Sequence, residues 1–412
     1  MSNIFATPPH PVTKGILSPF QISVPDEEVQ HFKTLLNLCP IAAPNYANNA
    51  SHRGTFGVTR DWLVNAKTYW ESQFSWREHE TILNSIPQFK IQVKDDHTPD
   101  GDGSRYSIHF AALFSQKTDA VPIIMMHGWP GSFIEFLPIL LKVLDQYADK
   151  PSELPFHIIV PSLSGFGFSS PPSETKDFSP IDQARVLVKM MTALGFDRFV
   201  AQGGDLGSFV ATAMAVQHPE VAALHLNLVA MLTQPTGLKD PSYTQAELDA
   251  LQRAKSFLAT EADFATLQGH KPSTAGLAVG SSPIALLAWI GEKMVAWSDP
   301  ATRPSLDHIL LNISLYWFTR SYPTSLWYYR NFVDPSRGDR VTIEDVRDKL
   351  LGFSLFAKEL AYPPKAWRDA CGNFTWFREH GKGGHFAAFE QPDELWQDVV
   401  DFVNEQWKQQ DG

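Results

Sequence analysis

The chain has 412 residues, of which 43% are hydrophobic and 12% aromatic, and its formal net charge is −11 at pH 7. This length fits one large α/β domain with insertions, and the composition suffices for a sizeable core and a deep apolar pocket. The acidic balance argues against nucleic acid or an anionic membrane as a partner.

Residues 1–112 are expected to form an N-terminal arm and meander that ends in the first strands. The first part of this region is rich in proline and is expected to be extended. Apolar residues at helical spacing predict helices from about Pro25 to Phe89, and Thr59 is placed to cap one of them. No motif in these helices carries chemistry, and their aromatic side chains are interpreted as packing residues: Trp62, Trp70, Phe74 and Trp76.

Short apolar runs alternate with helical stretches over residues 113–232, the first part of the predicted core. VPIIMM, LPFHIIVPSL, FDRFVAQGGD and VAALHLNLVA are predicted strands, and the segments between them have helical periodicity. FKIQV, which precedes this span, and YSIHFAALF, which runs into its start, are also predicted strands. Alternation of buried strands with helices predicts the α/β class, with a parallel sheet and helices on both of its faces.

The alternation stops over residues 233–335, where the sequence predicts only helices. Strand signals resume near Leu350, and FTWFREH is the last predicted strand, in a second part of the core that spans residues 336–412. A helical block inserted between strand–helix units is expected to form a cap over the carboxyl edge of the sheet. Folds of this kind bind their ligands at that edge.

The segment AQGGDLGSF joins a predicted strand to a predicted helix through a turn centred on Asp205. Gly203 and Gly207, two residues before and after the centre, are what a strained strand-to-helix turn requires, because the neighbouring chain leaves no room for side chains. Asp205 is therefore a candidate nucleophile, although Asp also caps helices well. A carboxylate that attacks saturated carbon forms an ester that water can cleave, so epoxides and alkyl halides are the predicted substrates.

The loop HGWPGS, which follows the first strong strand, is a candidate partner of this turn. Such a loop normally supplies one backbone donor to an oxyanion hole. The N–H groups of Trp129 and Leu206 are the candidate donors for the intermediate that forms when water attacks the ester. His127, in the same loop, is interpreted as a structural residue.

The chain order nucleophile, acid, histidine places the predicted base near the C-terminus. His385, in GKGGHFAAFE, is the candidate general base, whereas His380 is interpreted as the end of the preceding strand. Glu359, in GFSLFAKELAYPP, is the candidate acid that orients this histidine. Asp334 and Asp339 are alternatives for that role. If one of them orients His385, Glu359 is a solvated carboxylate without a catalytic role.

Eight motifs together resemble the microsomal-type epoxide hydrolases, especially their soluble fungal members: HGWPGS, PSLSGFGFSSPP, QGGDLGSF, KPST, SSPIALLAWIGEK, SLYW, GFSLFAKEL and GGHFAAFE. The resemblance covers nearly the whole chain and implies an α/β-hydrolase fold with a helical cap and an N-terminal meander. It implies that Asp205 is the nucleophile, His385 the base and Glu359 its acid partner. The implied reaction opens a small apolar epoxide to a vicinal diol with water, and the implied assembly is a homodimer. No cofactor and no metal are expected.

In the family that the chain resembles, two cap tyrosines hydrogen-bond the epoxide oxygen as the ring opens. One of them aligns with Tyr329, but the other aligns with Phe264, which cannot donate a hydrogen bond. Three hypotheses stay open: Tyr329 acts alone on activated epoxides, another hydroxyl such as Tyr316 or Tyr328 substitutes, or the site serves another ring-opening task such as a cyclisation. Phe264 and Tyr316 are candidate residues of the substrate pocket.

Two other functions use parts of the same pattern. A haloalkane dehalogenase has the same Asp–His pairing but needs a halide donor such as Trp directly after the nucleophile, where this chain has Leu206. A non-catalytic binder of apolar ligands would explain Phe264, but the intact set of Asp205, His385 and Glu359 argues against it.

The sequence shows no sign of export or membrane insertion. No run of about 18 apolar residues and no signal peptide is evident. The two cysteines, Cys39 and Cys371, define no disulfide framework and are expected to be reduced thiols. A cytoplasmic protein without a membrane anchor, acting in detoxification, is the expectation.

Overall fold

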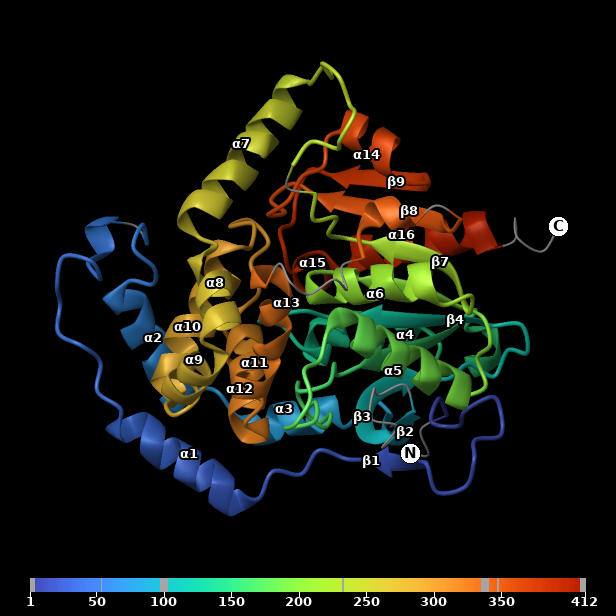
Figure 1. The fold of residues 1–412 in the computed structure, drawn as a ribbon. Coiled ribbons are helices and arrows are strands. Elements are labelled where there is room, and N and C mark those ends of the chain that lie inside the picture. Colours follow the sequence, from blue (N-terminus) through green and yellow to red (C-terminus); the bar gives the residue numbers. More distant parts are fainter. Residues whose placement is uncertain are drawn as a thin grey trace.

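The computed structural model describes residues 4–52, 54–96, 103–231, 233–334, 341–346 and 348–407. A nine-stranded sheet with the order β1-β2-β3-β5-β4-β6-β7-β8-β9 forms its centre. The strands are β1 (Leu17–Phe20), β2 (Gln88–Asp95), β3 (Ser104–Leu113), β4 (Val121–Met126), β5 (Phe156–Pro161), β6 (Phe199–Gly203), β7 (Val221–Leu226), β8 (Leu350–Phe356) and β9 (Phe374–His380). Figure 1 shows the sheet and its helices on one side of the molecule and the cap and N-terminal helices on the other.

The sheet is mixed, so the prediction of a wholly parallel sheet is wrong at one edge. The strands from β5 through β4, β6, β7 and β8 to β9 are parallel, as predicted. Antiparallel pairs join β1 to β2, β2 to β3 and β3 to β5. The connection between β2 and β3 is too short for a crossover helix, which explains why this pair is antiparallel. The expected extended arm contributes β1 to that edge.

The N-terminal helices are α1 (Asp26–Leu38), α2 (Arg60–Ser72) and α3 (Trp76–Leu83). The hydroxyl of Thr59 accepts a hydrogen bond from the N–H of Trp62, so the predicted cap of α2 is confirmed. Of the four aromatic residues predicted to pack in this region, Trp62 is partly buried and the other three are buried: Trp70, Phe74 and Trp76. Helices α1 and α2 pack on the cap helix α10 (Pro283–Ala296), which joins the meander to the cap.

Two pairs of helices flank the parallel strands. Helices α5 (Pro180–Ala193) and α6 (Leu206–Gln217) pack on each other, and α6 also packs on β4, β6 and β7. Helices α4 (Leu137–Gln146) and α16 (Pro392–Gln406) form the other pair, and α16 packs on β7 and β8. The remaining core elements are α14 (Lys365–Cys371), α15 (Ala387–Glu390) and the short turns η2 (Phe133–Phe136), η3 (Pro151–Glu153) and η5 (Ile343–Asp345), whereas the turn η1 (Ala50–His52) lies between α1 and α2.

The cap contains helices and no strand among its described residues, as predicted. Besides α10 it comprises α7 (Gln245–Thr260), α8 (Asp263–His270), α9 (Pro272–Val279), α11 (Leu306–Thr319), α12 (Tyr322–Ser325), η4 (Trp327–Tyr329) and α13 (Arg330–Val333). The cap meets the core where β4 ends, because the ring of Trp129 lies 5.3 Å from that of Phe264 and 5.6 Å from that of Tyr329. The carboxyl edge of the sheet is thus covered by cap side chains.

Two global features bear on the expected location of the protein. No single helix among the described residues is long and apolar enough to cross a membrane; α9 and α10 pass that test only as a pair, which is bent by 116°. Cys39 and Cys371 are both free thiols, as the cysteine count predicted.

Candidate active site

Asp205 lies at the tip of the sharp turn between β6 and α6. Its φ of 47° and ψ of −126° are costly for a residue with a side chain, on the order of 1–3 kcal/mol. A Cβ on Gly207 would lie 2.2 Å from the carbonyl oxygen of Met126, so the turn tolerates only glycine there. The Asp205 side chain makes no capping hydrogen bond to α6. The geometry therefore argues against the alternative that Asp205 is merely a helix cap.

The loop after β4 brings a backbone donor to this carboxylate. The N–H of Trp129 donates to Oδ1 of Asp205 at 2.6 Å. A Cβ on Gly128 would lie 2.1 Å from the same oxygen, which explains the glycine. Leu206 is the first residue of α6, so its N–H has no acceptor within the helix. Both candidate oxyanion-hole residues thus lie beside Asp205.

Three side chains hold this loop in place. The N–H of Leu163 donates to Nε2 of His127 at 3.2 Å, and burial lowers the pKa of this histidine to about 4. From the cap helix α11, the amide of Asn312 donates to the carbonyl of Pro130 at 2.7 Å. The hydroxyl of Tyr316 donates to the carbonyl of Gly131 at 2.8 Å. This contact argues against the hypothesis that the Tyr316 hydroxyl substitutes for the missing cap donor, because that group already anchors the loop.

His385 connects Asp205 to a second carboxylate. Its Nδ1 lies 2.7 Å from Oε1 of Glu359, and its Nε2 lies 3.2 Å from Oδ2 of Asp205. The N–H of Leu360 also donates to Oε1 of Glu359, at 2.6 Å, and fixes the orientation of that carboxylate. Among the described residues, Glu359 rather than Asp334 is the carboxylate at Nδ1, and Asp339 lies outside the described residues.

The charges around His385 keep its imidazole protonated while Asp205 is ionised. Burial alone lowers the pKa of His385, but the carboxylates of Glu359 and Asp205 outweigh it and raise that pKa well above 6.5. Loss of the negative charge on Asp205 would remove part of this effect. The basicity of His385 is thus coupled to the chemical state of the residue that it faces.

The loop that carries His385 is fixed by backbone contacts. The N–H of His385 donates to the carbonyl of Trp297 at 3.0 Å, and that of Gly383 donates to a carboxylate oxygen of Asp299 at 3.0 Å. His380, the competing histidine, ends β9 as predicted. Its Nε2 lies 2.6 Å from a carboxylate oxygen of Asp398, so its ring is engaged in a structural contact.

Aromatic rings of the cap pack against Trp129, in the loop that also donates to Asp205. The ring of Phe264 stacks on Trp129 with an angle of 12° between the planes, and it lies 5.0 Å from Trp297 and 5.6 Å from Tyr329. The hydroxyl of Tyr329 has no hydrogen-bond partner among the described residues. By contrast, the hydroxyl of Tyr328 has two possible acceptors, the carbonyl oxygen of Ser164 at 3.0 Å and Oε1 of Gln183 at 2.7 Å. Tyr329 therefore retains a free donor, whereas Tyr328 does not.

Sequence reasoning missed Glu135 in η2. A cavity of about 10 Å³, with room for about one water molecule, is lined by Asp205, His385, Glu135 and Asn227. Burial raises the pKa of Glu135 to about 8, and the nearby charge of Asp205 adds to this effect. Glu135 is therefore a neutral acid at pH 7, with a proton to donate. Its one sequence signal is an acidic residue in the otherwise apolar run FIEFLP directly after HGWPGS.

Comparisons with known proteins bear on the fold and the family of this chain. Residues 17–136 match the model of the epoxide hydrolase N terminus, and residues 121–310 match that of the alpha/beta hydrolase fold. The chain is 31% identical over 421 residues to epoxide hydrolase 1 of Oryctolagus cuniculus, which covers 94% of this chain and 88% of that one. The structure of the Aspergillus niger epoxide hydrolase matches with a TM-score of 0.88 and 42% identity, over 98% of this chain and 100% of that one. The juvenile hormone epoxide hydrolase of Bombyx mori matches with a TM-score of 0.76 and 26% identity, over 95% and 94% of the two chains.

Proposed function

This chain belongs to the epoxide hydrolase family, and from that premise we propose that it opens an apolar epoxide to a vicinal diol through a covalent ester on Asp205. One observation carries the proposal: Oδ1 of Asp205 accepts the Trp129 N–H, while Oδ2 lies 3.2 Å from Nε2 of His385. A carboxylate held between a backbone donor and an imidazole suits attack on saturated carbon, followed by hydrolysis of the ester by water.

In the first step, Asp205 attacks an epoxide carbon and the ring oxygen leaves as a developing alkoxide. Tyr329 donates a hydrogen bond to that oxygen, since its hydroxyl has no partner among the described residues and its ring packs on Trp129, which contacts Asp205. Burial, and then the charge of Asp205, raise the pKa of Tyr329 well above 10, so the phenol is protonated throughout the working range. Phe264 contributes an apolar face beside it and no donor.

In the second step, His385 activates water against the ester of Asp205. Alkylation has by then removed the negative charge of Asp205, which is one of the two charges that raise the pKa of His385. The pKa of His385 therefore falls, and its proton can pass to the alkoxide of the opened ring; the neutral imidazole, oriented by Glu359, then takes a proton from the attacking water. Trp129 and Leu206 then stabilise the tetrahedral oxyanion.

Glu135 positions the attacking water in this scheme. Its protonated carboxyl lines the cavity of about 10 Å³ that also holds the Asp205 and His385 groups, so it can hydrogen-bond a water between them. Because Glu135 is neutral below its pKa of about 8, it adds no charge that would oppose the oxyanion.

Glu135→Gln is expected to change the alkaline limb of the pH profile. In the unmodified chain, Glu135 loses its proton as the pH rises through about 8, and turnover falls because a charge then enters the cavity. Gln has a similar shape and stays neutral, so the variant should retain turnover at pH 7 and lose this decline. Glu135→Leu, with no polar group, should lower turnover at every pH. An identical alkaline decline in the Gln variant would contradict the role of Glu135.

Phe264→Tyr is expected to raise turnover more on alkyl oxiranes than on aryl oxiranes. An aryl group stabilises positive charge on the adjacent carbon, so cleavage of its C–O bond depends less on hydrogen bonds to oxygen. A second donor is worth up to about 2.7–4 kcal/mol by comparison with oxyanion holes, so gains above about tenfold on the alkyl substrate are expected. Tyr329→Phe is the matched control, because it removes the remaining hydroxyl donor, and it should slow the turnover of both substrates. Equal rates in the Phe264→Tyr variant and the unmodified chain would show that Tyr329 suffices alone.

The proposal is tested on matched pairs of oxiranes and chloroalkanes with the same substituent. The purified protein should release diol from the oxirane and no chloride from the chloroalkane, because Leu206 offers no side-chain donor to a departing halide. Chloride release without diol formation would favour a dehalogenase. Absence of both, across aryl and alkyl substrates, would favour a non-catalytic binder.

We also propose a cytoplasmic homodimer. The free thiols of Cys39 and Cys371 suit a reducing compartment. The dimer rests on the resemblance to the family and is checked by light scattering, where a monomer mass would contradict it.

A further inference from the structure

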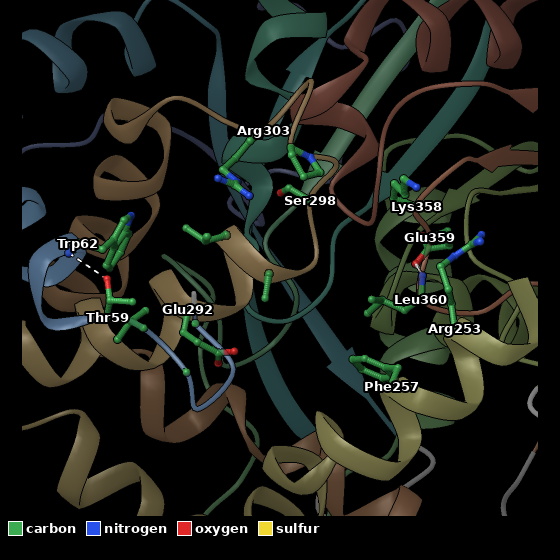
Figure 2. Close-up of a pocket in the computed structure, with 16 residues that line it drawn as sticks. Thr59, Trp62, Arg253, Phe257, Glu292, Ser298, Arg303, Lys358, Glu359 and Leu360 are labelled. Carbon is green, nitrogen blue, oxygen red and sulfur yellow. Dashed lines mark hydrogen bonds between the residues drawn. The ribbon is translucent and has the colours of Figure 1, made fainter. Parts of the chain in front are cut away.

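A hollow of about 490 Å³ adjoins the loop that carries Glu359, apart from the nucleophile. Figure 2 shows Trp62 and Thr59 on one side of it and Arg253, Lys358 and Phe257 on another. The hollow shares no lining residue with the small cavity at Asp205. Its volume lies in the usual range for a small-molecule site. It is therefore a second candidate binding site, distinct from the reaction centre.

Three cations line this hollow without a carboxylate partner among the described residues: Arg253, Arg303 and Lys358. In the described part of the chain, the guanidinium of Arg253 donates to the carbonyl of Ala357, at 3.3 Å, and to no carboxylate. By contrast, the Arg378 guanidinium pairs with two carboxylates, those of Asp398 and Asp401. In a protein with a net charge of −11, three unpaired cations around one hollow form a local site for an anion.

The two acidic residues of the hollow do not neutralise these cations. Glu292 forms an ion pair with Lys293, which does not line the hollow. The Glu359 side chain is only 1% exposed, and its Oε1 is engaged by Nδ1 of His385 and by the N–H of Leu360. The walls are therefore positive on balance.

The rest of the lining is largely apolar. Trp62, Phe257, Val295 and Leu360 are partly buried, pack on the core and leave part of their surface to the hollow. An inorganic anion would leave these side chains in contact with water, and a neutral epoxide would leave the cations unpaired. The matching ligand has an apolar body and a single carboxylate.

We propose that this hollow binds an amphipathic carboxylate of the fatty-acid type, as a ligand separate from the epoxide. Its carboxylate pairs with the cations on the wall, and its chain covers the apolar residues. The backbone N–H of Lys358 donates to the carbonyl of Gly383 at 2.9 Å, which links the Glu359 loop to the His385 loop, so a ligand held by the Lys358 side chain would bind beside this link.

Occupancy of the hollow should slow the reaction without blocking the nucleophile. An anion beside the Glu359 loop stabilises the protonated form of His385, and water activation needs the neutral form. The expected kinetic result is inhibition that higher epoxide concentrations do not relieve. This kinetic consequence rests on the proposed function, whereas binding of the carboxylate does not.

The binding test is calorimetry with dodecanoate, and with dodecanol as the neutral analogue. One dodecanoate should bind per chain, and dodecanol should bind more weakly. The triple variant Arg253→Gln, Arg303→Gln and Lys358→Gln should weaken dodecanoate binding at least about tenfold. A control variant with the same charge change at exposed positions outside the hollow, Lys14→Gln, Lys33→Gln and Lys271→Gln, should bind as the unmodified chain does.

Several outcomes would overturn the proposal. These are equal binding by the triple variant, equal binding of dodecanol, no saturable binding up to about 1 mM, or inhibition that epoxide competes away. A change of oligomeric state in the triple variant, with dodecanoate binding intact, would assign these cations to a contact between subunits. Diol formation with no dodecanoate binding refutes this inference alone, and dodecanoate binding with no diol formation refutes the proposed function alone.

Discussion

Asp205→Asn is expected to lower epoxide turnover by at least about 10⁴-fold, as loss of a catalytic nucleophile does in other covalent hydrolases. The amide is a poor nucleophile, so no ester forms. Asn has nearly the same shape as Asp and tolerates positive φ, so the turn at φ 47° should be kept. Its amide oxygen still accepts the Trp129 N–H. The loss of activity should therefore occur in a folded protein.

The measurement is diol formation under steady-state conditions, together with the melting temperature of each protein. The matched control is Asp149→Asn, an exposed position for which the structure gives no hydrogen bond or ion pair. Its turnover should equal that of the unmodified chain. The assignment of the nucleophile is wrong if the Asp205→Asn variant retains about a tenth or more of the activity.

His385→Gln is expected to separate the two chemical steps. Asp205 can still attack the epoxide, but no base activates water against the resulting ester. Turnover should fall by about 10²–10⁴-fold, the usual contribution of a general base. The covalent ester should then accumulate to about one per chain, because it forms faster than it is hydrolysed.

Intact-protein mass spectrometry detects this ester as a gain of one substrate mass. The gain should be absent in the double variant that combines His385→Gln with Asp205→Asn. Glu359→Gln should show a smaller accumulation, because His385 is then less well oriented but still present. A fall in turnover with no adduct would place His385 before ester formation and would contradict its role as the base for water.

The parts of the site that follow from local steric rules were accessible from the sequence. The glycines around Asp205 indicate a turn in which a Cβ would lie only 2.2 and 2.3 Å from backbone atoms. Because only glycine fits such positions, this crowding can be predicted from the sequence. His385 follows from chain order and from the strand that precedes it. The cap helices and the parallel strands follow from hydrophobic period and length.

The parts that depend on long-range packing were not accessible. Glu135 is one acidic residue in an apolar run, and only the fold of η2 against the His385 loop buries it beside Asp205. Tyr316 looked available for a substrate, but its hydroxyl meets the carbonyl of Gly131, 185 residues away in the chain. The antiparallel edge of the sheet likewise depends on which strands meet. The period of the apolar residues predicts which side chains of a strand are buried, but it does not predict which other strand pairs with it.

The origin of the oxygen atom added to the substrate tests the account most directly. In a single turnover with excess enzyme in heavy-oxygen water, the diol should contain only ordinary oxygen, and the label should appear in the carboxylate of residue 205. This result means that the protein's own oxygen was transferred and then replaced from solvent. Label in the diol of that first turnover, with none in the carboxylate, would mean that water attacks the epoxide directly and that no ester forms.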